Sequence, residues 1–228
     1  APKSWLQRVP EILELLTAVE ETVIDRAAFE QVFSVRRRRA IQLMQRFGAV
    51  QAGQSLVLDR RTLINLLEPG DTAVLACNGY FGGRMVQIAE RCGAVPVKLE
   101  AEWGRPILPE QIEAALKQAR CARVLGVVHA ETSTGVLQPL EGLREMADRF
   151  GAYLLVDAVT SLGGHPVEVD RHGVDACYSG TQKALSAPTG LSPVTLSDRA
   201  MDRIRKRPRK LQSFYLDLAL FEQYWKGD

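Results

Sequence analysis

The sequence has 228 residues, enough for one large domain or for one domain and a small module, and its 46% hydrophobic and 25% charged residues are typical of a globular protein. The net charge of +2 excludes a strong polyelectrolyte, and no apolar run approaches the roughly 20 residues of a membrane span. Because no secretion signal opens the sequence, no cysteines have CxxC spacing and no histidines have metal-ligand spacing, we expect a cytoplasmic protein with reduced thiols and no metal.

Residues 1–67 are predicted to form a helical module. Apolar spacing and capping residues predict helices at 9–19, 26–33, 35–47 and 60–67, and a short strand at 54–58. Asp25 and Ser34 would cap the second and third of these helices, and Gly48 would end the third. This order of helices and strand is that of a small helix-turn-helix or winged module.

The first turns of the helix at 35–47 hold four consecutive arginines: Arg36, Arg37, Arg38 and Arg39. Arginines at the start of the second helix of a helix-turn-helix pair suit contacts with phosphates and base edges. One hypothesis is therefore that this module contacts DNA. No single position requires DNA binding, and the alternative is a helical arm that packs on the larger domain.

The pattern changes at residue 68, and residues 68–228 are predicted to form an α/β domain. Apolar runs predict strands at 73–77, 94–99, 124–129 and 153–157, and amphipathic segments predict helices at 83–92, 109–120 and 140–150. Alternating strands and helices imply a mostly parallel sheet covered by helices on both faces. Ligands of such sheets bind at the carboxyl ends of the strands. Four residues fall at or just beyond strand ends: Phe81, Thr132, Asp157 and Lys183.

Two of these residues carry the clearest chemical signal. Asp157 ends the apolar run at 153–156, and Lys183 follows a second short apolar segment. A lysine amine can form a Schiff base with the aldehyde of pyridoxal phosphate, and a carboxylate beside the protonated ring nitrogen keeps the ring an electron sink. The pair therefore predicts a pyridoxal phosphate site.

Longer motifs surround these residues: NGYFGGR at 78–84, HAETSTG at 129–135, DAVTSLGG at 157–164 and SGTQKAL at 179–185. With them, the chain from about Pro69 to Trp225 resembles the class V, fold-type I pyridoxal-phosphate aminotransferases, and most of all the alanine–glyoxylate and serine–pyruvate aminotransferases. The segment at 213–217 also fits this resemblance.

The resemblance implies a role for each matching residue. Lys183 would form the Schiff base and move the proton between the substrate α-carbon and the cofactor, and Asp157 would bind the ring nitrogen. The remaining cofactor contacts that it implies are Phe81 and Val159 on the two ring faces, Gly82 beside Phe81, Thr132 at a polar edge of the ring, and Gln182 at the phosphate. The alternatives without a cofactor role are a core position for Phe81, a turn threonine at 132 and an exposed Gln182.

The sequence also departs from the family. A loop that cradles the cofactor phosphate normally opens a helix shortly before the Pro-Gly-Asp turn, and the stretch 59–68 has no such loop. The family's smaller C-terminal domain supplies the arginine that binds the substrate carboxylate, and no residue here takes that role. We therefore expect an incomplete large domain joined to an unrelated N-terminal module.

The resemblance implies a homodimeric transaminase that moves an amino group from alanine or serine to glyoxylate or pyruvate, with activity impaired by the missing parts. A second hypothesis is a DNA-binding regulator, or an inactive fusion, that carries a degenerate pyridoxal-phosphate domain. A lyase such as a desulfurase shares the same core but needs a reactive cysteine on a flexible loop, and the motifs suit transamination better.

Overall fold

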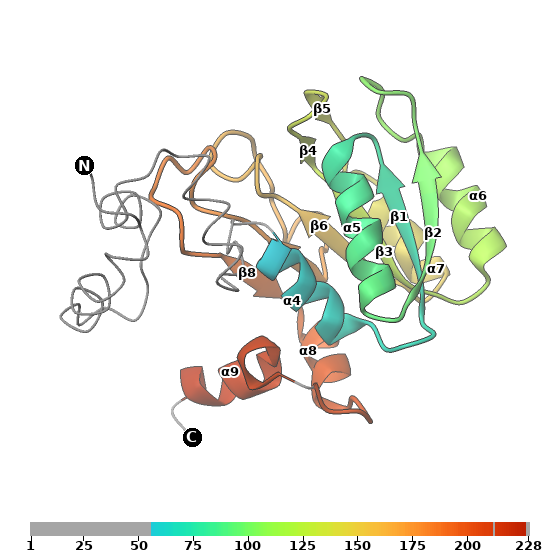
Figure 1. Cartoon of the computed structure of the whole chain (residues 1–228). Helices are drawn as coiled ribbons and strands as arrows, with labels where there is room; N and C mark the ends of the chain where they lie inside the picture. Colours follow the sequence, from blue (N-terminus) through green and yellow to red (C-terminus); the bar gives the residue numbers. More distant parts are fainter. Residues whose placement is uncertain (1–55, 212, 227–228) are drawn as a thin grey trace, which may run out of the picture. The chain divides into compact units, whose positions relative to one another are not determined.

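The computed structural model describes the backbone of residues 56–211 and 213–226, and the side chains of 61–211 and 213–224 (Figure 1). The helices predicted at 9–19, 26–33 and 35–47, together with the four arginines of the last one, lie outside the described residues. The chain divides into two compact units, Ala1–Ala52 and Gly53–Asp228, and the described residues all belong to the second.

A six-stranded sheet organises the described part, in the order β2-β1-β3-β6-β7-β8 (Figure 1). Its strands are β1 (Thr72–Cys77), β2 (Val95–Glu100), β3 (Ala122–Val128), β6 (Tyr153–Asp157), β7 (Ala176–Tyr178) and β8 (Val194–Leu196). The first five are parallel and β8 pairs antiparallel with β7. A small antiparallel pair, β4 (Ala130–Glu131) and β5 (Val136–Leu137), follows β3. The predicted mostly parallel α/β fold is confirmed.

Helices cover both faces of the sheet. They are α4 (Leu56–Leu66), α5 (Tyr80–Arg91), α6 (Pro109–Ala119), α7 (Leu143–Arg149), α8 (Asp198–Arg205), the short 3-10 helix η2 (Phe214–Leu216) and α9 (Leu218–Lys226). Leu75 packs with apolar residues of α4, α5 and α8, whereas its neighbour Val74 packs with those of α6 and α7. This alternation is expected for a strand buried on both faces.

The strand predicted at 54–58 is wrong for its described part, because Leu56–Leu58 begin helix α4. Three apolar residues in a row, Leu56 to Leu58, fit a strand or a buried helix equally well, and tertiary packing decides between them. The helix buries Leu63, Leu66 and Leu67 completely in the core that it shares with α5 and α8. Residues 56–67, assigned by the sequence to the N-terminal module, therefore pack as part of the α/β unit.

The C-terminal segment is tied to α4 by one buried amide. Asn65 is 1% exposed. Its Nδ2 donates to the carbonyl of Leu216 at 2.7 Å and its Oδ1 accepts from the backbone N–H of Leu218 at 3.1 Å. These bonds hold the end of η2 and the start of α9 against the first helix of the unit. None of the helices in the described ranges is long and apolar enough to cross a membrane.

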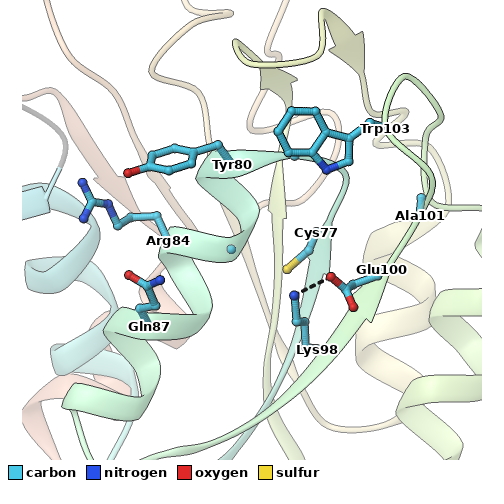
Figure 2. A pocket seen from close by; sticks show the side chains of 10 residues that line it. Cys77, Tyr80, Arg84, Gln87, Lys98, Glu100, Ala101 and Trp103 are labelled. Atoms are coloured by element: carbon cyan, nitrogen blue, oxygen red, sulfur yellow. Dashed lines mark ion pairs between the residues drawn. The ribbon is translucent and has the colours of Figure 1, made fainter.

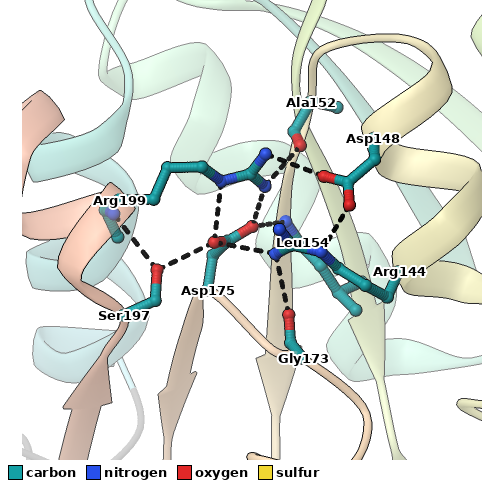
Figure 3. A network of polar contacts seen from close by, with 9 residues as sticks. Arg144, Asp148, Ala152, Leu154, Gly173, Asp175, Ser197 and Arg199 are labelled. Carbon is teal, nitrogen blue, oxygen red and sulfur yellow. Dashed lines mark hydrogen bonds and ion pairs between the residues drawn. The ribbon is translucent and has the colours of Figure 1, made fainter.

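A buried carboxylate joins the elements at the amino ends of β6 and β7 (Figure 3). Asp175 is fully buried and forms ion pairs with Arg144 and Arg199. It also accepts hydrogen bonds from Ser197 Oγ at 2.8 Å and from the backbone N–H of Leu154 at 2.9 Å. Burial acts to raise the pKa of Asp175, but the bonds from Arg199, Leu154 and Ser197 outweigh it, and the net shift is downward. The network fixes α7 and α8 to the sheet at the edge opposite the candidate site.

Candidate active site

The carboxyl ends of the parallel strands bring the sequence-predicted residues to one edge of the sheet. In the strand register Val128 pairs with Asp157, and Asp157 pairs with Tyr178. Phe81 lies in the first turn of α5, just after β1. The loops after β4, β6 and β7 carry Thr132, Val159 and Lys183 in that order. A site built from several strand ends is what an open α/β sheet provides.

Asp157 ends β6 with a carboxylate that is buried and held at both oxygens. Its Oδ1 accepts from the backbone N–H of Val159 at 2.8 Å, and its Oδ2 accepts from the hydroxyl of Tyr178 at 2.9 Å. Burial raises the pKa of Asp157 to about 6, the two hydrogen bonds limit the rise, and the charge of Glu131 adds to it. A protonated ring nitrogen beside this group would favour its ionised form, because an opposite charge stabilises a carboxylate.

Phe81 lies in the first turn of α5. Glu131, a residue to which the sequence analysis assigned no role, binds this turn. Glu131, at the end of β4, accepts at Oε2 from the backbone N–H groups of Phe81 at 3.0 Å and Gly82 at 3.1 Å. The only sequence signal for this role is an acidic residue inside the HAETSTG motif. Gly82 also packs closely on β1, because a Cβ there would come within 2.7 Å of the Cα of Cys77.

Thr132 and Val159 border the site from the loops after β4 and β6. The hydroxyl of Thr132 lies 2.5 Å from that of Thr160, which joins the two loops. Val159 is a buried member of the apolar cluster against which Phe81 packs. Phe81 and Val159, which are expected on the two faces of the cofactor ring, therefore border the same apolar cluster.

His129, just before β4, is a buried strand-end residue. Its Nδ1 lies 3.0 Å from Ser161 Oγ and its ring contacts that of His165 edge-on. Burial lowers the pKa of His129 to about 4, and His165 and His172 add to the shift. The ring is therefore neutral near pH 7 and serves as a hydrogen-bonding partner of Ser161.

Lys183 and Gln182 lie in the loop between β7 and β8. Ser179 anchors the start of this loop, since its hydroxyl donates to the carbonyl of Ala158 at 3.0 Å. Gln182 folds back over Gly180, where a Cβ would lie 2.7 Å from Gln182 Oε1. Lys183 is half-buried, and residues 184–193 are exposed. The loop thus begins next to Asp157, since Tyr178 pairs with Asp157 in the sheet.

A cleft of about 240 Å³ opens on the other side of α5, over β2 (Figure 2). Its walls include Tyr80 and Arg84 of α5, an ion pair between Lys98 and Glu100 of β2, and Trp103. None of the sequence-predicted cofactor residues lines it. Cys77 lies at its base, and burial raises the pKa of this thiol to about 12, so it stays protonated and is a poor nucleophile.

The edge suits the ring of pyridoxal phosphate. It offers a buried carboxylate, the apolar side chains of Phe81 and Val159 at one cluster, and a lysine on an adjoining loop. Asn78, directly after β1, is 1% exposed, and neither of its polar side-chain atoms has a hydrogen-bond partner within the described residues. A buried amide of this kind needs a partner, and a ligand at this edge could supply it.

The inference that the phosphate loop is missing is not supported. The stretch 59–68 lacks such a loop because α4 already begins at Leu56, so residues 59–66 are the body of the helix. A helix N-terminus that could cradle a phosphate belongs to the residues just before Leu56, and these lie outside the described part of the chain.

The family model for class V aminotransferases matches residues 50–226. The chain belongs to this family. Class V aminotransferases depend in general on pyridoxal phosphate and have the fold-type I sheet. Residues 1–49 lie outside the match.

Three relatives illustrate the family likeness. Alanine–glyoxylate aminotransferase of Oryctolagus cuniculus is 43% identical over 73% of this chain and 42% of its own length. (S)-Ureidoglycine–glyoxylate transaminase of Bacillus subtilis is 34% identical over 82% of this chain and 49% of its own length. The crystal structure of alanine–glyoxylate aminotransferase from Nostoc sp. has a TM-score of 0.73 and 36% identity, over 95% of this chain and 58% of that one. The chain therefore spans about half the length of the relatives that it matches.

Proposed function

We propose that this class V chain holds pyridoxal phosphate and serves a transaminase that moves an amino group from alanine or serine to glyoxylate or pyruvate. The observation that carries the proposal is the buried Asp157, whose two oxygens are oriented at the strand edge by Val159 and Tyr178. Two of the relatives reported above, one compared by sequence and one by structure, are named for alanine and glyoxylate, which supports the choice of substrates.

When bound, pyridoxal phosphate supplies an aldehyde that couples amines and a ring that withdraws electrons from the substrate α-carbon. Asp157 would bind the protonated ring nitrogen and keep it protonated. Phe81 and Val159 would exclude water from the two ring faces, and Thr132 would bond a polar edge of the ring. Lys183 would hold the cofactor and would hold or move the proton of the substrate α-carbon at its Nζ.

The whole enzyme is expected to be a homodimer, the usual state of this family. Large apolar side chains at the C-terminal end are consistent with a covered surface, since Phe214 is 84% exposed and Tyr224 is 85% exposed. Exposed aromatic groups of this size are common at protein–protein contacts.

An absorption spectrum with added pyridoxal phosphate tests the proposal. We expect a visible band that borohydride removes, and peptide mapping of the reduced protein should place the cofactor on Lys183. Lys183→Ala should lose the band, whereas Lys206→Ala, which removes an exposed lysine of α8's C-terminus, should keep it. A cofactor adduct found mainly on Lys206 or Lys210 would contradict the assignment.

A further inference from the structure

Glu131 is a nearly fully buried carboxylate, 1% exposed, that binds four donors from two different segments. Its Oε2 accepts from the backbone N–H groups of Phe81 and Gly82. Its Oε1 accepts from the backbone N–H of Ser133 at 3.0 Å and from the hydroxyl of Ser133 at 2.7 Å. The same hydroxyl oxygen accepts from the backbone N–H of Tyr80 at 2.9 Å. One carboxylate and one hydroxyl therefore join the start of α5 to the loop after β4.

Helix α5 has no cap of its own. The first N–H groups of a helix have no partner within it, and here the N-cap residue is Gly79, which has no side chain, and the first turn contains no acidic residue. The first backbone bond that closes within the helix runs from Gly83 to Gly79 at 3.2 Å. The three N–H groups before it are those bound by Glu131 and Ser133. A negative charge at a helix N-terminus is also favoured by the helix dipole.

The close approach of these two segments explains Gly79. A Cβ at this position would lie 2.4 Å from Cγ of Glu131 and 2.5 Å from Oγ of Ser133. The backbone at Gly79 is extended, with φ of 170°, so conformation alone does not require glycine. Space for the Glu131 side chain does.

This arrangement controls the spacing of two residues that would contact the cofactor ring. Phe81 is bonded to Glu131 through its backbone, and Thr132 is the next residue after Glu131. Thr132 in turn contacts Thr160, next to Val159. Functional groups must be held to within about 0.5 Å of their productive geometry by the residues that support them. Glu131 is the support that joins the end of β1 to the end of β3.

We propose that Glu131 is a positioning residue that fixes the start of α5 against the loop after β4, and so holds Phe81 and Thr132 at the spacing required by the cofactor ring. The inference rests on the proposed function, since it assigns the ring to this edge. Glu131 does not touch the reacting atoms in this arrangement, and acts through Phe81 and Thr132.

Two variants of the full chain test the proposal in different ways. Glu131→Gln keeps the size of the side chain, but its amide NH₂ must face either the N–H groups of α5 or the N–H and hydroxyl of Ser133. Gly79→Ala keeps the charge and displaces Glu131 through the added Cβ. Glu145→Gln makes the same chemical change as the first variant on the exposed face of α7 and serves as the control.

The first measurement is amide hydrogen exchange of the chain without cofactor. We expect both variants to speed exchange in the peptide spanning residues 78–86 by about tenfold or more, because hydrogen bonds to a charged acceptor are lost. Exchange in β6 should stay as in the control. Unchanged exchange at residues 80–82, or a rise spread evenly over the sheet, would overturn the proposal. If Glu131→Gln does not fold, hydrogen exchange of Gly79→Ala alone tests the proposal.

The second measurement is binding of pyridoxal phosphate, followed by absorption and by circular dichroism of the visible band. We expect the dissociation constant to rise by about tenfold in both variants and the dichroism per bound cofactor to fall, because Phe81 is no longer fixed against the ring. Faster exchange with unchanged binding and dichroism would reduce Glu131 to a helix cap and overturn the positioning role. A parent chain that binds no cofactor would instead overturn the proposed function.

Discussion

Asp157 occupies an environment that opposes its charge, and Tyr178 offsets part of that effect. The carboxylate is buried, and within the described residues it accepts hydrogen bonds from two donors, the hydroxyl of Tyr178 and the backbone N–H of Val159. Its pKa of about 6 lies close to the physiological range, so a small change in its partners alters how much of it is ionised at pH 7. The tyrosine therefore sets the charge as well as the orientation of the carboxylate.

Tyr178→Phe should destabilise the chain without cofactor in a manner that depends on pH. The folded-state pKa of Asp157 is already raised above its ordinary value, so its contribution to stability is greatest at low pH and is lost as pH rises through about 6. Loss of the hydroxyl raises this pKa further and enlarges the loss at high pH. We expect the thermal midpoint of the variant to fall by about 4 °C at about pH 8 and by less than half of that at about pH 5.

Thermal unfolding of the parent and variant at the two pH values measures this difference. Tyr153→Phe, at the opposite end of β6, removes a hydroxyl remote from Asp157 and is the control. A deficit for Tyr178→Phe that is equal at both pH values would show that the hydroxyl packs against Asp157 without affecting its ionisation.

At the scale of elements, the groups that stabilise the sheet and the groups of the candidate site lie at opposite ends of its strands. The carboxyl ends of the strands carry the candidate site, and the amino ends of β6 and β7 carry the buried network of Asp175 (Figure 3). Tyr178 lies three residues after Asp175 in the same strand segment, so the network that fixes the start of β7 also fixes the strand that presents the hydroxyl to Asp157. A rigid strand between the two ends is a suitable support for a site that needs fixed groups.

Asp175→Asn should cost roughly 3 kcal/mol of unfolding free energy, because removal of one partner leaves the charges of Arg144 and Arg199 without their buried carboxylate. Urea unfolding at about pH 7 measures the change. Asp148→Asn is the matched control, since Asp148 contacts the same two arginines from the surface and its side chain is 43% exposed. Its loss should cost under about 1 kcal/mol. Equal losses in the two variants would contradict the argument.

The sequence predicted the elements that local patterns specify. Strands β1, β2, β3 and β6 and helices α5, α6 and α7 lie within three residues of their predicted bounds, because apolar runs and amphipathic spacing are local. The true extent of α4 depends on packing and was missed. The edge strand β8 is three residues long and no more than half-buried, so it gave no apolar run.

The same distinction holds for the candidate site. The motifs alone predict Asp157 and Lys183, whose chemistry is specific to their residue types, and their roles stay a prediction. Glu131 and Tyr178 were missed because their roles depend on contacts 49 and 21 residues away in sequence. Such contacts follow from the strand order and register, which sequence patterns alone do not supply.

At the scale of the whole molecule, the family match covers part of the chain. The class V match covers residues 50–226, and the chain spans 42% of the rabbit relative's length. Residues 1–49 lie outside the match and contain Arg36–Arg39. Cofactor binding by the α/β unit does not depend on what residues 1–49 do. Cofactor binding and DNA contact by the same chain are therefore compatible hypotheses.

The DNA hypothesis predicts binding that weakens steeply with salt, because each phosphate neutralised by an arginine releases counterions. Arg37→Ala with Arg38→Ala should weaken binding of the full chain to duplex DNA and reduce the slope of log affinity against log salt by about 2, at roughly 0.9 per phosphate contact. Fluorescence anisotropy over a salt series measures both quantities. Arg209→Ala with Lys210→Ala removes the same charge from an exposed basic segment of the other unit and should change the slope less. Equal changes in the two double variants would indicate nonspecific attraction by net charge. No binding even at low salt would favour a helical arm, because a recognition helix with four arginines should bind phosphate under those conditions.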